Sequence, residues 1–213
     1  METRSKQRKH ISDCVDKFGD VWEYVCLFLS LKDIKNLKLC SKTIQKRLRI
    51  LFSKRFRVNI TKDVLNDPRF REVVNYVSAV KIVSLDVLEK FLSLKERGLV
   101  YDIMFQHIFN QSVDGILPPT LTHLTFGMNF NQRVERLPPT LTYLRLGTDF
   151  NQIINAFPPT LTHLRFGSGF NQIINAFPPT LTHLTFGSDF NQIINAFPPT
   201  LTHLAFGFFL IKV

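Results

Sequence analysis

Histidines recur at a fixed interval in the second half of this chain of 213 residues. His123, His163, His183 and His203 stand 20 or 40 residues apart, and Tyr143 fills the missing place in the series. Imidazole moves protons near neutral pH and is the commonest metal ligand. The repeated segment contains no Cys and few carboxylates that could complete a metal site. We therefore expect no metal or cofactor and interpret the series as a candidate contact surface, with metal binding as the alternative.

A second series lies two residues further along in each interval, and it reads Thr125, Arg145, Arg165, Thr185 and Ala205. Residues two apart on a strand point to the same side, so both series are expected on one exposed face. Aromatic residues and Arg anchor many protein interfaces. We predict that a target protein contacts seven of these residues, namely His123, Tyr143, His163, His183, His203, Arg145 and Arg165. The alternative is that copying of a repeated unit spread them without selection on each.

Catalytic groups outside these two series are sparse. No Ser/His/Asp or Cys/His arrangement stands apart from the repeated pattern, and the glycines do not form a Gly-x-Gly-x-x-Gly phosphate loop. His10 and Cys14 share a helix face by their spacing, but two residues alone do not define a site. We do not expect this protein to be an enzyme.

The elements that position the two series belong to a repeat of 20 residues. Pro–Pro pairs begin at Pro118, Pro138, Pro158, Pro178 and Pro198, and Phe-Asn-Gln begins at Phe130, Phe150, Phe170 and Phe190. A fixed period of this size is typical of a solenoid, in which each repeat forms one turn and stacks on the next. Each Pro–Pro pair predicts an extended corner, and the Leu-x-x-Leu-x-Phe pattern that follows predicts a short strand in a parallel sheet.

Within each turn the strand is expected to separate inward from outward side chains. Leu124 and Phe126 should face the core, while His123 and Thr125 face outward. Gly127 ends the strand at a place where a positive φ or close packing is needed.

Equivalent positions of stacked turns are expected to form columns. The Phe130 column should lie in the core. The Asn131 column should be buried and satisfy turn backbone groups, each of which would cost about 1–3 kcal/mol if left unpaired.

The solenoid is expected to span residues 99–213 and to begin with a divergent copy. Val100-Tyr-Asp-Ile-Met-Phe105 matches Leu121-Thr-His-Leu-Thr-Phe126, with one more residue before the next Pro–Pro pair than in other copies. Residues 58–98 are interpreted as a linker and capping segment. It should contain short helices around residues 64–74, a strand over 79–83 and a helix from 87 to about 97, capped by Asp86 and closed by Gly98.

The last repeat is interrupted at residues 208–213, and no polar cap follows. An open apolar turn invites pairing with another chain. Three interpretations stay open: the tail folds back as a cap, two chains associate end to end through the last turn, or the sequence is truncated.

The net charge of +10 is confined to the first half of the chain. Residues 1–100 contain 22 Lys and Arg against 12 Asp and Glu, whereas residues 101–213 contain 5 of each. This change in net charge between the two halves indicates two parts with separate roles. Nucleic acid is the less favoured partner, because most basic residues alternate with apolar ones as on solvated helix faces. Residues 1–10 are expected to form a disordered basic tail.

The cysteine content bears on the compartment in which the protein is found. The chain contains three cysteines, at positions 14, 26 and 40. Their odd number and the lack of a signal peptide favour a reducing compartment. No stretch approaches 18 apolar residues, so no membrane association is expected. We predict a cytoplasmic location, with the nucleus as the alternative.

Residues 11–57 have the apolar periodicity of three short helices. Apolar residues between positions 21 and 29 recur at steps of three and four. Asp33 and Ser41 are expected to cap the second and third helices. Helices this short bury little surface alone, so they need the next segment or a partner to cover them.

This helical segment resembles an F-box over Val21–Lys42. The family motif has a Leu-Pro opening, a helix ending in Phe-Leu, then Asp-Leu-x-x-Leu and Val-Cys-Lys; here Leu-Pro is replaced by Lys17-Phe18, and the aromatic after the last Lys by Ile44. The resemblance implies that the segment binds a Skp-type adaptor. The residues implied in this contact are Phe18, Val21, Val25, Phe28, Leu29, Asp33, Ile34 and Leu37. A three-helix packing module without a partner is the alternative.

The repeats resemble leucine-rich repeats of the short type, and with Phe-Asn-Gln they resemble FNIP repeats. Proteins that pair an F-box with FNIP repeats form a family in large DNA viruses of amoebae and in social amoebae. The resemblance implies an α+β chain, with a three-helix F-box-like block over residues 11–57 before a leucine-rich-repeat-like parallel β-solenoid.

The same resemblance implies a substrate-receptor subunit of a Skp-cullin-F-box ubiquitin ligase, in the host cytoplasm if the protein is viral. The alternative is a stand-alone interaction scaffold whose helical block is only an N-terminal cap.

Overall fold

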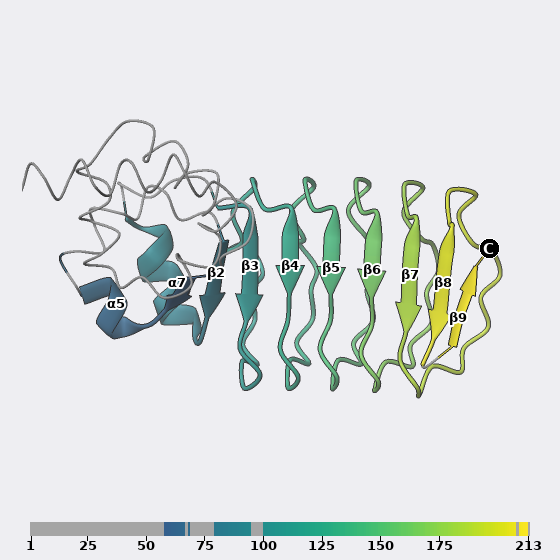
Figure 1. The fold of residues 1–213 in the computed structure, drawn as a ribbon, viewed down its shortest axis with the longest axis horizontal. Helices are drawn as coiled ribbons and strands as arrows, with labels where there is room; N and C mark the ends of the chain where they lie inside the picture. Colours follow the sequence, from purple (N-terminus) through teal and green to yellow (C-terminus); the bar gives the residue numbers. More distant parts are fainter. Residues whose placement is uncertain (1–57, 67, 69–78, 95–99, 208, 213) are drawn as a thin grey trace, which may run out of the picture.

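The computed structural model describes residues 58–66, 68, 79–94, 100–207 and 209–212. Its centre is a nine-stranded sheet in which the strands follow their order in the sequence (Figure 1). The strands are β1 (Val58–Ile60), β2 (Ala79–Ile82), β3 (Asp102–Phe105), β4 (His123–Thr125), β5 (Tyr143–Arg145), β6 (His163–Arg165), β7 (His183–Phe186), β8 (His203–Phe206) and β9 (Phe209–Lys212). The parallel β-solenoid is confirmed, while the predicted helical block over residues 11–57 lies outside the described residues.

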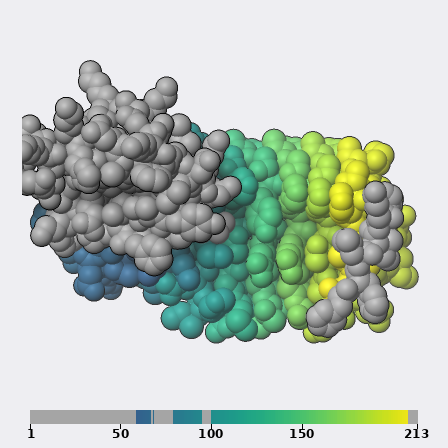
Figure 2. All heavy atoms as spheres, in the orientation of Figure 1, coloured from purple at the N-terminus to yellow at the C-terminus, as the bar shows by residue number. Residues whose placement is uncertain are grey.

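The register of the sheet follows the period of the sequence. Leu124 pairs with Leu144, and each later pair through Leu204 keeps the step of 20 residues. Ile103 pairs with Leu124, a step of 21, which confirms the divergent first copy and its one extra residue. The turns therefore follow one another along the long axis in chain order (Figure 2).

The sheet also continues on the N-terminal side of the repeats. β2 was predicted and pairs in parallel with β3, whereas β1 was not predicted and pairs in parallel with β2. The short helix α5 (Lys62–Asn66) and the helix α7 (Leu85–Leu92) accompany these strands, and α5 falls where a short helix was expected. Val87, Leu88 and Phe91 of α7 are buried in the common core.

Helix α7 differs from its prediction at both ends. Ser84, not Asp86, occupies the N-cap position, and the helix ends at Leu92 rather than near residue 97. Asp86 lies in the first turn, where its carboxylate accepts a hydrogen bond from the Ser84 hydroxyl and pairs with Lys62 at 2.9 Å. These two contacts lower the pKa of Asp86 to about 2. The helix stops where the Ser93 hydroxyl donates to the Lys90 carbonyl. The predicted closing residue, Gly98, lies outside the described residues.

Phenylalanine side chains form the centre of each turn. The rings of Phe130, Phe150, Phe170 and Phe190 lie 6.0–6.1 Å apart between successive turns and are nearly parallel. Within a turn, the Phe126 ring lies 3.7 Å from the Phe130 ring. Leu124 and Leu144 are fully buried beside them. Phe130, Phe150 and Phe170 are fully buried and Phe190 is half-buried, which confirms the predicted Phe column as core. Burying such a side chain contributes about 1.5–3 kcal/mol before entropy.

Glycine recurs after strands β4, β5, β6 and β7 because neighbouring turns approach too closely for a side chain. A Cβ at Gly147 or Gly167 would collide with the carbonyl oxygen of the glycine one turn earlier. Neither residue has a positive φ, so close packing and not backbone conformation requires glycine there. Among the described residues, only Gly115 and Gly207 adopt positive φ, at 78° and 53°.

Threonine hydroxyls join neighbouring turns beside the Pro–Pro corners. Thr160 donates to the carbonyls of Pro139 and Leu141 in the preceding turn. Thr162 donates to the Thr142 carbonyl at 3.0 Å. The same bonds recur in the other regular turns.

The C-terminal strand closes the sheet in the opposite direction. β9 pairs antiparallel with β8 after a turn at Gly207. The interpretation that the tail folds back is therefore confirmed, while end-to-end association of two chains stays a prediction. Among the described residues, no helix is long and apolar enough to cross a membrane.

Candidate functional site

The predicted histidine series forms a continuous column on the outward face of the sheet. Register partners bring His123 beside Tyr143, and the two rings lie 5.7 Å apart. The rings of His163 and His183 lie 4.2 Å apart, and those of His183 and His203 lie 4.1 Å apart, each pair nearly parallel. The structure thus brings all five predicted residues of this series together, although it does not test their binding role.

Each histidine is oriented by the threonine before it. Nδ1 of His163 lies 2.9 Å from Oγ1 of Thr162, whose single proton is already donated to the Thr142 carbonyl. The imidazole must therefore carry its proton on Nδ1 and donate it to the threonine. His183 and His203 repeat this contact with Thr182 and Thr202, so Nε2 is the nitrogen left to accept a hydrogen bond in the neutral rings.

The column geometry does not suit a metal site. The rings of His163, His183 and His203 are stacked nearly parallel, so their Nε2 lone pairs run side by side and do not converge on one point. A tetrahedral ion needs ligands that converge at about 2.0–2.1 Å. In the part of the chain that the structure describes, no group of three or more His, Cys, Asp and Glu side chains could hold a metal ion.

Two of the stacked histidines resist protonation. Burial lowers the pKa of His163 below its ordinary value, and His123 and His203, each two turns away, lower it further. Burial likewise lowers the pKa of His183, with His163 and His203 as the next causes. A charged ring at the centre of the column would be partly buried and would lie near other histidine rings. The centre of the column is therefore held in the neutral form near neutral pH.

The second outward column is longer than the sequence indicated. Its register partners run Lys81, Met104, Thr125, Arg145, Arg165, Thr185 and Ala205. Sequence reasoning missed Lys81, because no repeat pattern aligns β2. It also left out Met104, although the divergent first copy aligns this residue with Thr125. Thr125 was expected to be exposed but is only 5% exposed, although its column faces outward. The neighbouring Arg145 and Arg165 are both exposed.

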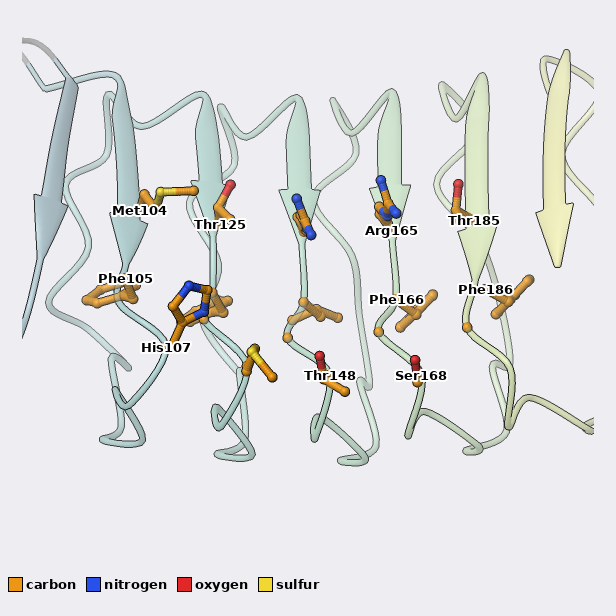
Figure 3. Close-up of a pocket in the computed structure, with 18 of the residues that line it drawn as sticks. Met104, Phe105, His107, Thr125, Thr148, Arg165, Phe166, Ser168, Thr185 and Phe186 are labelled. Carbon is orange, nitrogen blue, oxygen red and sulfur yellow. The ribbon is translucent and has the colours of Figure 1, made fainter. Parts of the chain in front are cut away.

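A groove of about 350 Å³ follows this second column across the sheet. In Figure 3, Thr125, Arg165 and Thr185 lie along one side of it, and Thr148 and Ser168 lie along the other. The rings of Phe166 and Phe186 lie between the two rows. Sequence reasoning missed Thr148 and Ser168, although both stand directly after the strand-ending glycine of their turn and this position was available as a signal.

The predicted asparagine column satisfies backbone groups, but it is not buried. Oδ1 of Asn151 accepts the backbone N–H of Asn171 and the side-chain amide of Gln172, both at 3.0 Å. Asn151 is nonetheless exposed, and Asn131 is half-buried. The amide ladder therefore runs along the rim of the turns, because only the Phe before each Asn points into the core. The Gln half of this ladder was not predicted.

The eight residues predicted to bind an adaptor, from Phe18 to Leu37, lie outside the described residues. The structure therefore does not bring them together or test their arrangement.

Comparison with known proteins supports the repeat assignment. The model of the FNIP Repeat family matches residues 109–136, 133–169 and 170–209. A solved structure titled "The crystal structure of CroV588 a novel circular LRR protein structure" is 41% identical over 71% of this chain, with a TM-score of 0.54. This chain corresponds to 22% of the length of that protein. No curated protein matches the chain. FNIP repeats in a leucine-rich-repeat-like solenoid are therefore confirmed.

Proposed function

We propose that this chain is an interaction scaffold, in which the outward face of strands β4–β8 binds another protein. One observation carries the proposal. The 20-residue register gathers Tyr143, Arg145, His163 and Arg165 into one patch, and both guanidinium groups are exposed. Tyr and Arg are enriched among the residues that dominate binding energy at protein interfaces. The FNIP repeats and the leucine-rich-repeat-like solenoid support the choice of an interaction scaffold as the class of function.

Partner capture with a matched pair of full-length variants tests this proposal. The face variant combines Tyr143→Ala with Arg165→Ala, and the control combines Arg133→Ala with Ile153→Ala, two exposed positions on the amide-ladder side of the turns. We expect proteins recovered by the wild type to be retained by the control and lost from the face variant. Circular dichroism should show that both variants keep the wild-type fold. If the two variants recover the same proteins, this face is not the binding surface.

The finer hypothesis is a substrate receptor in a cullin-type ubiquitin ligase. It rests on the F-box-like sequence pattern of Val21–Lys42 and on the family that pairs this pattern with FNIP repeats. A purified Skp-type adaptor is expected to bind the wild type and the Tyr143→Ala/Arg165→Ala variant equally, but to lose a Phe28→Ala/Leu29→Ala variant. Equal adaptor binding by the wild type and the Phe28→Ala/Leu29→Ala variant, or no binding at all, would leave the plain scaffold as the better description.

A further inference from the structure

The groove on the outward face is lined by cations and by no carboxylate. Among its lining residues, Lys81, Arg145 and Arg165 carry positive charge. Residues 101–213 contain five acidic side chains, and none of them lines the groove. We propose that this groove binds an extended acidic segment of a partner protein, in which Arg145 and Arg165 hold one carboxylate and Lys81 holds a second. This inference rests on the proposed scaffold function and specifies the chemistry of its partner.

The two arginines provide the strongest argument. Arg145 and Arg165 are direct register partners on adjacent strands, whose backbones lie about 4.8 Å apart, so two like charges stand side by side. Such a pair is destabilising in the free protein. Within the described part of the chain, neither guanidinium has an acidic partner. A carboxylate between them would remove the repulsion and accept charge-assisted hydrogen bonds from both.

The groove has the length of a short extended peptide. It touches six strands, from Lys81 on β2 to Thr185 on β7, which corresponds to about 24 Å at the usual strand spacing. An extended chain advances about 3.3 Å per residue, so about seven residues would fill it. Lys81 lies three strands from Arg145, or about 14 Å. Two carboxylates four residues apart would therefore reach both cationic positions.

The opposite wall supplies neutral donors. Thr148 and Ser168 line the groove across from the arginine column, and their hydroxyls have no hydrogen-bond partner among the described residues. A hydroxyl can donate to a carboxylate oxygen or to a peptide carbonyl. Ser188 also lines the groove, but its hydroxyl already donates to Asp189 at 2.8 Å. The arginine-containing centre thus has donors on both sides.

A protein segment fits this site better than a nucleic acid. Nucleic-acid surfaces collect many cations to neutralise successive phosphates. Here the whole of residues 101–213 is electrically balanced, and the groove offers three permanent cations in one line. The few cations, interleaved with Met104 and Thr125, match a segment of mixed polarity.

Fluorescence anisotropy with labelled ten-residue peptides tests the proposal on the full-length chain. The peptides carry two Glu separated by one to six positions in a Gly/Ser/Ala background, and each has a counterpart with Gln at the same positions. We expect the pair spaced by four to bind at least tenfold more tightly than its Gln counterpart. Its affinity should fall as salt is raised, because exposed charges are screened.

Substitutions in the chain test which cation of the groove binds which carboxylate of the peptide. Arg145→Gln and Arg165→Gln should each weaken the best peptide by about tenfold or more, because a hydrogen bond to a charged group contributes about 1.5–3 kcal/mol. Arg133→Gln is the matched control, since Arg133 lies outside the groove and near Glu135 at 3.9 Å. Lys81→Gln should abolish the preference for a spacing of four but retain binding of a single Glu. Circular dichroism verifies the fold of each variant.

Three results would overturn the inference. They are equal binding of Glu and Gln peptides at every spacing, equal effects of Arg145→Gln and Arg133→Gln, or tighter Arg145-dependent binding of a single-stranded oligonucleotide than of any peptide. If no acidic peptide binds but captured proteins still depend on Tyr143 and Arg165, the acidic-segment inference fails while the scaffold function stands. If the face variant also recovers the same proteins as the wild type, both the acidic-segment inference and the scaffold function fail.

Discussion

The amide ladder, formed by the Asn and Gln of each Phe-Asn-Gln, and the outward face of the strands (the strand face) belong to the same turns. They differ in how constant their residue types are from turn to turn. Along the ladder, Phe, Asn and Gln occupy the same three places from residue 130 to residue 192. Along the strand face, one column instead reads Lys81, Met104, Thr125, Arg145, Arg165, Thr185 and Ala205.

This difference separates stability from recognition. The Phe of each copy packs in the core of its turn, and Asn110, Asn131, Asn151 and Asn171 each accept two hydrogen bonds from the next turn, so these turns share the same requirement. No such requirement acts on the outward column, where charged, apolar and hydroxyl side chains all fit. We infer that the ladder side sets the stability of the solenoid and that the strand face is free to set what it binds.

The largest effect is expected from Gly167→Ala. The new Cβ would meet the Gly147 carbonyl oxygen and force two turns apart, at a cost of about 3 kcal/mol or more in the free energy of unfolding. Urea denaturation followed by circular dichroism measures this cost. Gly115→Ala is the matched control, because no atom lies within 4 Å and only its φ of 78° opposes a side chain, which costs about 1–2 kcal/mol. Equal losses in the two variants would show that turn spacing is not the constraint.

A smaller loss is expected when one step of the amide ladder is removed. Asn151→Ala takes away the oxygen that accepts from Asn171 and Gln172, and should lower the free energy of unfolding by about 1–2 kcal/mol. Asn151→Asp keeps an acceptor oxygen at that place and should lose less in the same denaturation experiment. An Asn151→Ala variant as stable as the wild type would contradict the structural role given to the ladder.

The histidine column makes stability depend on pH in a defined direction. Because the folded-state pKa of His163 and of His183 lies below the unfolded value of about 6.5, the unfolded chain binds more protons below that pH. The melting temperature should therefore be constant above pH 7 and fall as the pH is lowered from about 6.5 to 5. The effect should be modest, since both rings are partly solvated.

His183→Tyr tests the source of this pH dependence. Tyr143 already occupies the equivalent place two turns earlier, so the substitution copies a side chain that the column accepts. The variant should lose part of the decline between pH 6.5 and 5. An unchanged pH profile would assign the decline to other groups.

The smallest effect is expected from Arg165→Thr, which copies Thr185 of the next turn. Arg165 is exposed and unpaired within the described residues, so the free energy of unfolding should change by no more than about 0.5 kcal/mol. The same variant should lose binding to the captured partner. A stability loss as large as that of Asn151→Ala would contradict the separation of stability, assigned to the amide ladder, from recognition, assigned to the strand face.

The repeat period was enough to predict most of the fold. It located the strands that contain His123, His163 and His203, their parallel pairing and the inward Phe column, since equal spacing forces equal positions into line. The divergent turn around Ile103 was also found, because its apolar spacing survives the loss of the glycine.

The remaining features depend on contacts that no period encodes. β1 is short, and its pairing with β2 is set by tertiary packing, so it was missed. Lys81 belongs to the second outward column only through the pairing of β2 with β3, which no repeat pattern marks. The asparagines were expected to be buried because their bonding role was known, but a ladder along the rim satisfies the same groups without burial. The target surface was predicted, whereas the groove required the loop positions of Thr148 and Ser168.

The side-chain bonds between turns have a direction with consequences for how the protein is made. Asn171 and Gln172 donate to Asn151, and Thr160 donates to Pro139 and Leu141, so within residues 100–207 the donor belongs to the later turn. A ribosome releases the N-terminal turns first. Each newly synthesised turn therefore finds its acceptors already in place, and the solenoid can be completed one turn at a time without waiting for the end of the chain.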